Sequence, residues 1–136
     1  MRREHGAAVV EFALVVILVI VLLFGLIELG RALFKWNSAV YATGRGARTA
    51  AIVAVGNSAA VLAEMRTIMP ELDGSNVAIE YSIDGNFPGA ACVRGTCRFV
   101  RVSVNYVFHP AVFFLPISIA MPTFSTTYPA EALGAT

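Results

Sequence analysis

Apolar residues fill the first part of the chain without the polar positions that a soluble helix would show. From Ala7 to Ile27 the only charged residue is Glu11. A helix rises about 1.5 Å per residue, so this run would be roughly 31 Å long, close to the ~30 Å hydrocarbon core of a bilayer. The pattern therefore predicts a membrane-spanning helix over residues 7–27.

Beyond Ile27 the apolar residues recur at helical spacing, and basic and polar residues fall on a different side. The apolar side carries Leu33, Trp36, Val40, Ala47 and Ala51, and the other side carries Arg31, Lys35, Ser38, Arg45 and Arg48. This predicts one long N-terminal helix over residues 7–56, in which an amphipathic extension follows the membrane span.

Four glycines lie within this predicted helix, namely Gly25, Gly30, Gly44 and Gly46. Each costs about 1 kcal/mol relative to alanine in a helix interior. Small residues let another backbone come close where helices pack in membranes. Helix packing at these four positions is one interpretation, and kinking of the helix is the other.

The second half of the chain changes its period. Asn57 or Ser58 can cap a short helix that ends at about Met69, before Pro70. The segments VAIEYSID and RFVRVSVNYVF then alternate with period two, which is typical of half-buried strands. Val77, Ile79, Tyr81 and Ile83 share one face of the first segment, opposite Ala78, Glu80 and Ser82; Val100, Val102, Val104, Tyr106 and Phe108 share a face of the second.

A third extended stretch, ISIAMPTFSTTYPAE, contains Pro122, which predicts an edge strand or a broken one. The expected fold class is α+β: a long N-terminal transmembrane and amphipathic helix, a short second helix, and a small antiparallel sheet of about three strands. Residues 57–136 would form the small domain outside the membrane.

Composition and charge exclude several functions. Hydrophobic residues make up 57% of the chain and charged residues 14%, too apolar for an ordinary soluble domain of this size. The formal charge of +1 gives no basic patch for nucleic acid. Neither His5 nor His109 has catalytic neighbours in the sequence, and no ligand spacing suggests a metal. We expect no enzymatic activity, no cofactor and no metal.

Both cysteines lie in CVRGTC, as Cys92 and Cys97, within the part expected to leave the membrane. Their spacing suits a disulfide across a tight loop. It does not suit a zinc site, because two thiolates without further ligands cannot complete a tetrahedral shell. The pattern favours a disulfide and hence a location outside the cytoplasm, with two free buried thiols as the alternative.

An apolar patch over residues 111–117 lies between two prolines and contains Phe113, Phe114, Leu115 and Ile117. A loop that covers the open face of the sheet is one interpretation of this patch. An exposed contact for a partner or for the membrane surface is the other.

Glu11 is unusual, because a charged residue in a membrane span costs ~2.5–3.5 kcal/mol at the helix centre on insertion scales and is a functional candidate. It could also lie near the end of the span and reach the headgroups. Its context favours a function: a short polar leader ends at Gly6, and Glu11 is the fifth residue after it, followed by Phe12.

This arrangement resembles the processing site of type IV prepilins. Residues 5–53 further resemble the TadE-like family of tight-adherence (Tad) pilus proteins, in which a similar apolar helix leads into a Gly-Arg step and then a Gly-Ala-Arg stretch. Here these are Gly30-Arg31 and Gly46-Ala47-Arg48.

The resemblance implies that residues 1–6 are a leader and that a prepilin peptidase cuts between Gly6 and Ala7. It implies that Glu11 would then face the new N-terminal ammonium of a neighbouring subunit. The implied protein is a minor pilin or pseudopilin in the bacterial inner membrane, with its C-terminal domain outside the cytoplasm and later at the cell surface. Its partners would be other pilin or pseudopilin subunits, the inner-membrane assembly platform and the lipid bilayer.

Other interpretations remain. An uncleaved single-pass anchor could display the small domain as a scaffold or sensor. A secretory signal is disfavoured because the apolar run is too long and continues as helix. Arg2 and Arg3 give only a weak match to a twin-arginine export signal. More basic residues follow the span than precede it. By the positive-inside rule this favours a C-terminal part in the cytoplasm, which is the opposite of the pilin orientation.

Overall fold

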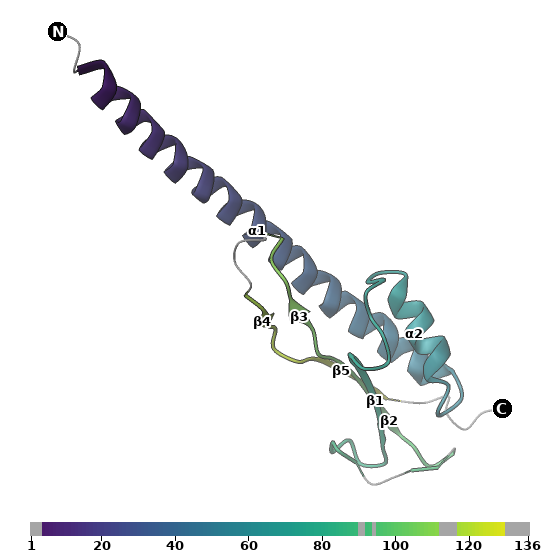
Figure 1. Ribbon diagram of the computed structural model, residues 1–136. Helices are drawn as coiled ribbons and strands as arrows, with labels where there is room; N and C mark the ends of the chain where they lie inside the picture. Colours follow the sequence, from purple (N-terminus) through teal and green to yellow (C-terminus); the bar gives the residue numbers. More distant parts are fainter. Residues whose placement is uncertain (1–3, 90–91, 94, 112–116, 130–136) are drawn as a thin grey trace.

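The computed structural model describes residues 4–89, 92–93, 95–111 and 117–129. The elements in chain order are α1 (Glu4–Ile52), α2 (Ser58–Arg66), β1 (Val77–Ser82), β2 (Phe99–Val104), β3 (Val107–Phe108), β4 (Ile119–Ala120) and β5 (Phe124–Pro129). The N-terminal half of α1 projects alone, and the other elements gather along its C-terminal half (Figure 1). The predicted α+β fold is confirmed.

The long helix differs from its predicted bounds. It begins at Glu4 and ends at Ile52, four residues before residue 56. β-branched Ile52 and Val53 are weak helix formers, and Gly56 takes a positive φ of 89° that turns the chain. Asn57 then caps α2, because its side chain accepts a hydrogen bond from the Ala60 N–H at 3.3 Å.

The second helix is also shorter than predicted, since it ends at Arg66 rather than Met69. After Arg66 the chain forms a turn, in which the N–H groups of Ile68 and Met69 both donate to the Met65 carbonyl. Pro70 follows and prevents a further turn of helix.

The main sheet has the order β1–β2–β5, with both pairs antiparallel. Val102 of β2 pairs with Ile79 on one side and with Thr126 on the other. As predicted, Pro122 breaks the last extended stretch, here into β4 and β5. The second predicted strand is also divided, so that β3 leaves the main sheet and pairs with β4.

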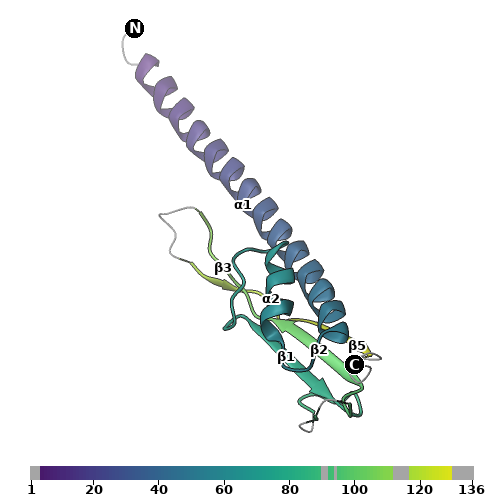
Figure 2. The same ribbon diagram turned by 90° about the vertical axis from the view of Figure 1, so that its right-hand side faces the viewer.

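The core lies between one face of the sheet and the two helices, which Figure 2 shows on the same side of the sheet. Val100, Val102 and Val104 are fully buried, as their alternation predicted. Val61 and Met65 of α2 are buried in the same cluster. Fully burying one such aliphatic side chain contributes about 1.5–3 kcal/mol.

The side of α1 that packs on this core was predicted only in part. Ala47 and Ala51 are buried as expected, but Leu33 and Val40 are 56% and 48% exposed. The buried side is made of small residues: Ala39, Ala42, Thr43, Gly46, Ala47, Ala50 and Ala51. Small side chains let α2 and the sheet come close to the helix, so the larger apolar residues are left outside.

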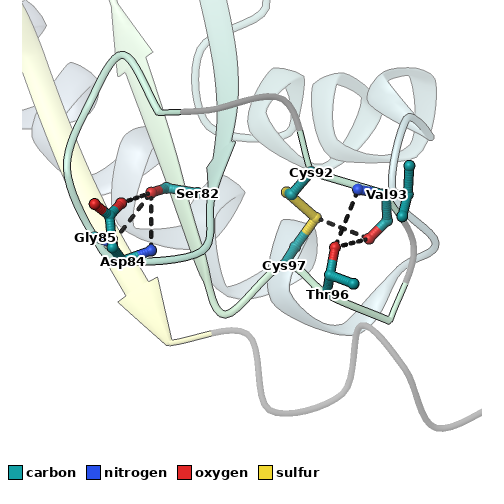
Figure 3. Close-up of a disulfide and its surroundings, with 7 residues drawn as sticks. All are labelled: Ser82, Asp84, Gly85, Cys92, Val93, Thr96 and Cys97. Atoms are coloured by element: carbon teal, nitrogen blue, oxygen red, sulfur yellow. Dashed lines mark hydrogen bonds between the residues drawn. A yellow bond between two sulfur atoms is a disulfide. The ribbon is translucent and has the colours of Figure 1, made fainter.

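Ser82 is buried, although the alternation placed it on the outer face of the sheet with Glu80. The segment after β1 folds back over it, and a Cβ on Gly89 would lie 2.7 Å from the Ser82 Cβ. The hydroxyl of Ser82 accepts from the Gly85 N–H at 3.1 Å and donates to the Asp84 carboxylate at 2.8 Å (Figure 3). Hydrogen bonds within a turn therefore compensate its burial.

We expect Ser82→Ala to raise the pKa of Asp84. The pKa of this carboxyl is lowered first by the Ser82 hydroxyl and then by Asn86, because both donate to its ionised form. The ionised Asp84 carboxyl thus stabilises the folded state at neutral pH. This contribution is lost as the pH falls through the lowered pKa of Asp84. A carboxyl NMR titration measures the shift. The control is Asp73, whose pKa Ser75 lowers independently and which should not change.

Candidate functional site

Among the described residues, none of the small domain buries the part of α1 that is predicted to span the membrane. Side chains from Val9 to Leu26 are exposed or only half-buried. Among the described residues, α1 is the one helix whose length and composition would let it cross a membrane. The prediction of a span over residues 7–27 is consistent with this apolar surface.

Glu11 lies one helical turn after Ala7, and residues four apart lie on the same side of a helix. Its side chain is exposed, and within the described part of the chain it forms no hydrogen bond or ion pair. Gly6 lies within α1, and nothing lies within 4 Å of an added Cβ there. Among the described residues, no side chain therefore crowds the position where a Cβ on Gly6 would lie.

The other glutamates with described side chains all pair with a cation. Glu28 contacts Arg31 at 2.8 Å, Glu64 contacts Arg45, Glu71 contacts Lys35, and Glu80 contacts Arg101 at 2.6 Å. These pairs are partly exposed, and surface pairs of this kind contribute about 0–1 kcal/mol each. Glu11 differs from them because it lies in the apolar segment and has no partner among the described residues.

Two of these pairs attach the small domain to α1, and sequence analysis did not find them. Lys35 contacts Glu71, which also accepts from the Tyr106 hydroxyl, and Arg45 contacts Glu64 on α2. Arg48 adds a third link, since its Nε donates to the Tyr128 hydroxyl at 3.0 Å. The partners are 19 to 80 residues apart in the chain, so no local pattern could have indicated them.

The four predicted packing glycines separate into two kinds. A Cβ on Gly46 would lie 2.5 Å from the Met65 sulfur, so Gly46 lets α2 approach α1. Gly25, Gly30 and Gly44 have nothing within 4 Å of an added Cβ. Gly46 thus packs against α2 of its own chain, and packing against another helix stays a prediction for all four glycines.

Cys92 and Cys97 form a disulfide, with their Cα atoms 5.4 Å apart (Figure 3). Inside the loop that it closes, Thr96 and Val93 exchange hydrogen bonds of 2.9 and 3.2 Å. Cys97 is buried against Val55 and Tyr81, so the loop is held to the small domain by apolar contacts. The structure favours the disulfide over the alternative of two free thiols.

We expect replacement of both cysteines by serine to lower the free energy of unfolding by about 2 kcal/mol, because a short cross-linked loop restricts the unfolded chain. Thermal unfolding of the whole chain in detergent, followed by near-ultraviolet circular dichroism, measures the effect. Reductant should lower the wild-type midpoint to that of the serine variant and leave the variant unchanged. Equal midpoints without reductant would contradict the expectation.

The predicted apolar patch falls largely outside the described residues, which include Ala111 and Ile117 but not 112–116. Ala111, its first residue, donates its N–H to Glu28 at 3.0 Å, and Arg31 lies over the Phe108 ring at 5.7 Å. Both contacts are made just beyond the predicted membrane span. Among the described residues, no group of three His, Cys, Asp or Glu side chains could hold a metal ion.

Residues 6–48 match the family described as TadE-like protein. The match begins at the predicted processing site and ends within the part of α1 that packs on the small domain. It confirms the resemblance to the TadE-like family and supports an involvement in Tad pilus assembly. Neither the curated proteins nor the solved structures contain a match to this chain.

Proposed function

We propose that this chain is a minor pilin or pseudopilin of a Tad-type pilus with no catalytic activity of its own. In this proposal a prepilin peptidase cuts after Gly6, and α1 carries the cleaved subunit from the inner membrane into the filament. The observation that carries the proposal is Glu11, a carboxylate with no partner among the described residues, one turn from Ala7 on an exposed apolar helix that matches the TadE-like family.

The chemistry of the cut explains why the leader would have to be removed. Before cleavage the nitrogen of Ala7 is a neutral peptide nitrogen. After cleavage it is an ammonium, which is expensive in an apolar environment, as is the Glu11 carboxylate. Pairing the two between subunits satisfies both charges and fixes the axial position of one apolar helix against the next.

The rest of the fold fits a subunit that is held by its helix. The described residues of the small domain pack along the C-terminal half of α1, which leaves the N-terminal half available to a helix bundle (Figure 1). The disulfide supports a domain outside the cytoplasm, because such bonds persist in oxidising compartments. We propose a single-pass topology with this orientation, in contrast to the positive-inside count.

Deletion and complementation in the native host test this function. We expect deletion of the gene to abolish or sharply reduce pili in sheared fractions, and the intact chain to restore them. A matched variant with Gly6→Phe should fail to restore pili if cleavage is required, because the bulky side chain occupies the position before the cut. Normal piliation in the deletion strain would exclude a role in assembly.

The alternative is an uncleaved anchor that displays the small domain as a scaffold or sensor. The positive-inside count is the observation that disagrees with the pilin topology. Persistence of residues 1–6 on the membrane-bound chain would favour the anchor.

A further inference from the structure

The β3–β4 pair lies outside the main sheet and runs along α1 toward the N-terminal half of that helix (Figure 1, Figure 2). Arg31 of α1 lies over the ring of Phe108, the last residue of β3, at 5.7 Å. Further along the chain, the Ala111 N–H donates to Glu28 at 3.0 Å. As the chain leaves β3 it therefore approaches the predicted membrane span.

These contacts lie at the depth of the lipid headgroups if the span of α1 ends at Ile27. A bilayer of ~40–45 Å has a hydrocarbon core of ~30 Å, which leaves a polar layer of roughly 5–8 Å on each side. A helix close to the membrane normal rises about 1.5 Å per residue, so it crosses this layer within about four or five residues. Glu28 and Arg31 are within that distance of the span, and the residues of the small domain that contact them are at the same depth.

The surface of the β3–β4 pair at this depth is apolar. Ile119 pairs with Phe108, so it is level with Arg31, and Ile117 precedes it on the side of the span. Ile117 is 47% exposed and Ile119 is 52% exposed. The sequence has no Asp, Glu, Lys or Arg between residues 102 and 129. Sheet edges that face water commonly carry charged residues, so this uncharged, exposed pair of strands indicates a surface that binds something apolar.

The depth of this surface makes lipid its occupant. Headgroups surround α1 at the level of Glu28 and Arg31 in every state in which the helix spans the bilayer, so a contact with lipid needs no further partner. The charges of these two residues compensate each other in an ion pair of 2.8 Å, which leaves no net charge beside the isoleucines. Interfacial segments bury their apolar side chains about 5–10 Å into the boundary between headgroups and acyl chains, a depth that Ile117 and Ile119 can reach.

We propose that the β3–β4 pair binds the surface of the membrane from which α1 emerges, with Ile117 and Ile119 inserted among the lipid headgroups. The small domain is then held against the bilayer at a second place besides α1, and this contact must be released when the subunit leaves the membrane. The inference goes beyond the proposed function. It requires that α1 spans the membrane, but it requires neither cleavage after Gly6 nor a filament.

Quenching by lipid tests this contact in the full-length chain, reconstituted in phospholipid vesicles at less than one chain per vesicle so that a second copy cannot cover the surface. The variants Ile117→Cys and Ile119→Cys are labelled with an environment-sensitive fluorophore without reductant, which keeps the Cys92–Cys97 disulfide intact. The control is Ile83→Cys, because Ile83 is 43% exposed but follows β1 at the end of the sheet away from β3. We expect phospholipids with a nitroxide near the headgroup to quench positions 117 and 119 at least about threefold more than position 83.

A second measurement needs no fluorophore and so excludes an affinity of the label for lipid. The same cysteine variants react in vesicles with a charged maleimide that cannot enter the bilayer, and each rate is divided by the rate for the same variant unfolded in denaturant. We expect the normalised rates at positions 117 and 119 to be at least about fivefold lower than at position 83. Equal rates at the three positions would overturn the inference, since the isoleucines would then face water.

A label at Leu18→Cys, in the middle of the predicted span, separates a failure of this inference from a failure of the span. Quenching of position 18 by a nitroxide deep in the acyl chains, without quenching at 117 and 119, would overturn the membrane contact of the β3–β4 pair and leave the proposed function standing. Slow modification at 117 and 119 without quenching by lipid would also overturn it, because protein would then cover the isoleucines. No quenching at position 18 would overturn the span, and with it both the inference and the proposed function.

Discussion

Glu11→Gln is expected to lower incorporation of the subunit into filaments by at least roughly 100-fold. Glutamine keeps the shape of the side chain but removes the charge that would pair with the ammonium of Ala7 in a neighbouring subunit. Breaking one partner of a buried ion pair costs about 3–5 kcal/mol, and each 1.4 kcal/mol is a factor of ten. The ratio of this chain in sheared pili to that in membranes, by quantitative immunoblot, measures the loss.

Glu64→Gln is the matched control, because it removes the same charge from a partly exposed pair with Arg45. A surface pair is worth about 0–1 kcal/mol, so we expect at most a few-fold change. The mass of the Glu11→Gln protein should show whether it is cleaved, which separates a failure to assemble from a failure to be processed. Wild-type incorporation of Glu11→Gln would exclude the pairing.

Gly46→Leu is expected to destabilise the small domain by about 1–3 kcal/mol. Even a Cβ at this position would lie 2.5 Å from the sulfur and 2.8 Å from the Cγ of Met65, which is fully buried. A larger side chain must therefore push α2 away from α1. Chemical unfolding of the full chain in detergent, under conditions where it is monomeric, gives the free energy of unfolding.

Gly44→Leu is the matched control on the same helix, since nothing lies within 4 Å of its added Cβ. It should leave stability unchanged or raise it by up to about 1 kcal/mol, because leucine is the better helix former. Equal destabilisation by the two variants would mean that glycine is needed for the backbone of α1 and not for the contact with Met65.

The elements of the fold could be predicted where the sequence signal is local. The apolar run predicted the N-terminal helix, the alternation of Val100, Val102 and Val104 predicted a strand with one buried face, and Pro122 predicted a break. The predicted end of α1 was less accurate, since the turn at Gly56 depends on how the two helices are placed against each other.

The buried side of α1 could not be predicted from hydrophobicity. Alanine and glycine contribute little apolar area, so Ala39 and Gly46 carry less signal than Leu33 or Val40, which lie outside. The buried side is decided by how closely α2 and the sheet approach α1, and this distance is a property of the assembled fold. Ser82 was misplaced for a similar reason, because the segment that covers it comes from beyond the strand.

The candidate site was more accessible to sequence analysis than the core. A carboxylate in a hydrocarbon-like segment is conspicuous by itself, and its distance from Gly6 gave it a role to test. The four glycines, by contrast, look alike in the sequence. Only the structure separates Gly46, where an added Cβ would meet Met65, from Gly44, where an added Cβ would meet nothing within 4 Å.

The most direct test of the central proposal is the intact mass of the chain purified from membranes of a host with its own Tad pilus machinery. We predict a mass that matches residues 7–136 less two protons for the Cys92–Cys97 disulfide, which would report cleavage after Gly6 and an oxidising location together. A mass that matches residues 1–136 in the reduced form would contradict both, and the chain would then be an uncleaved membrane anchor.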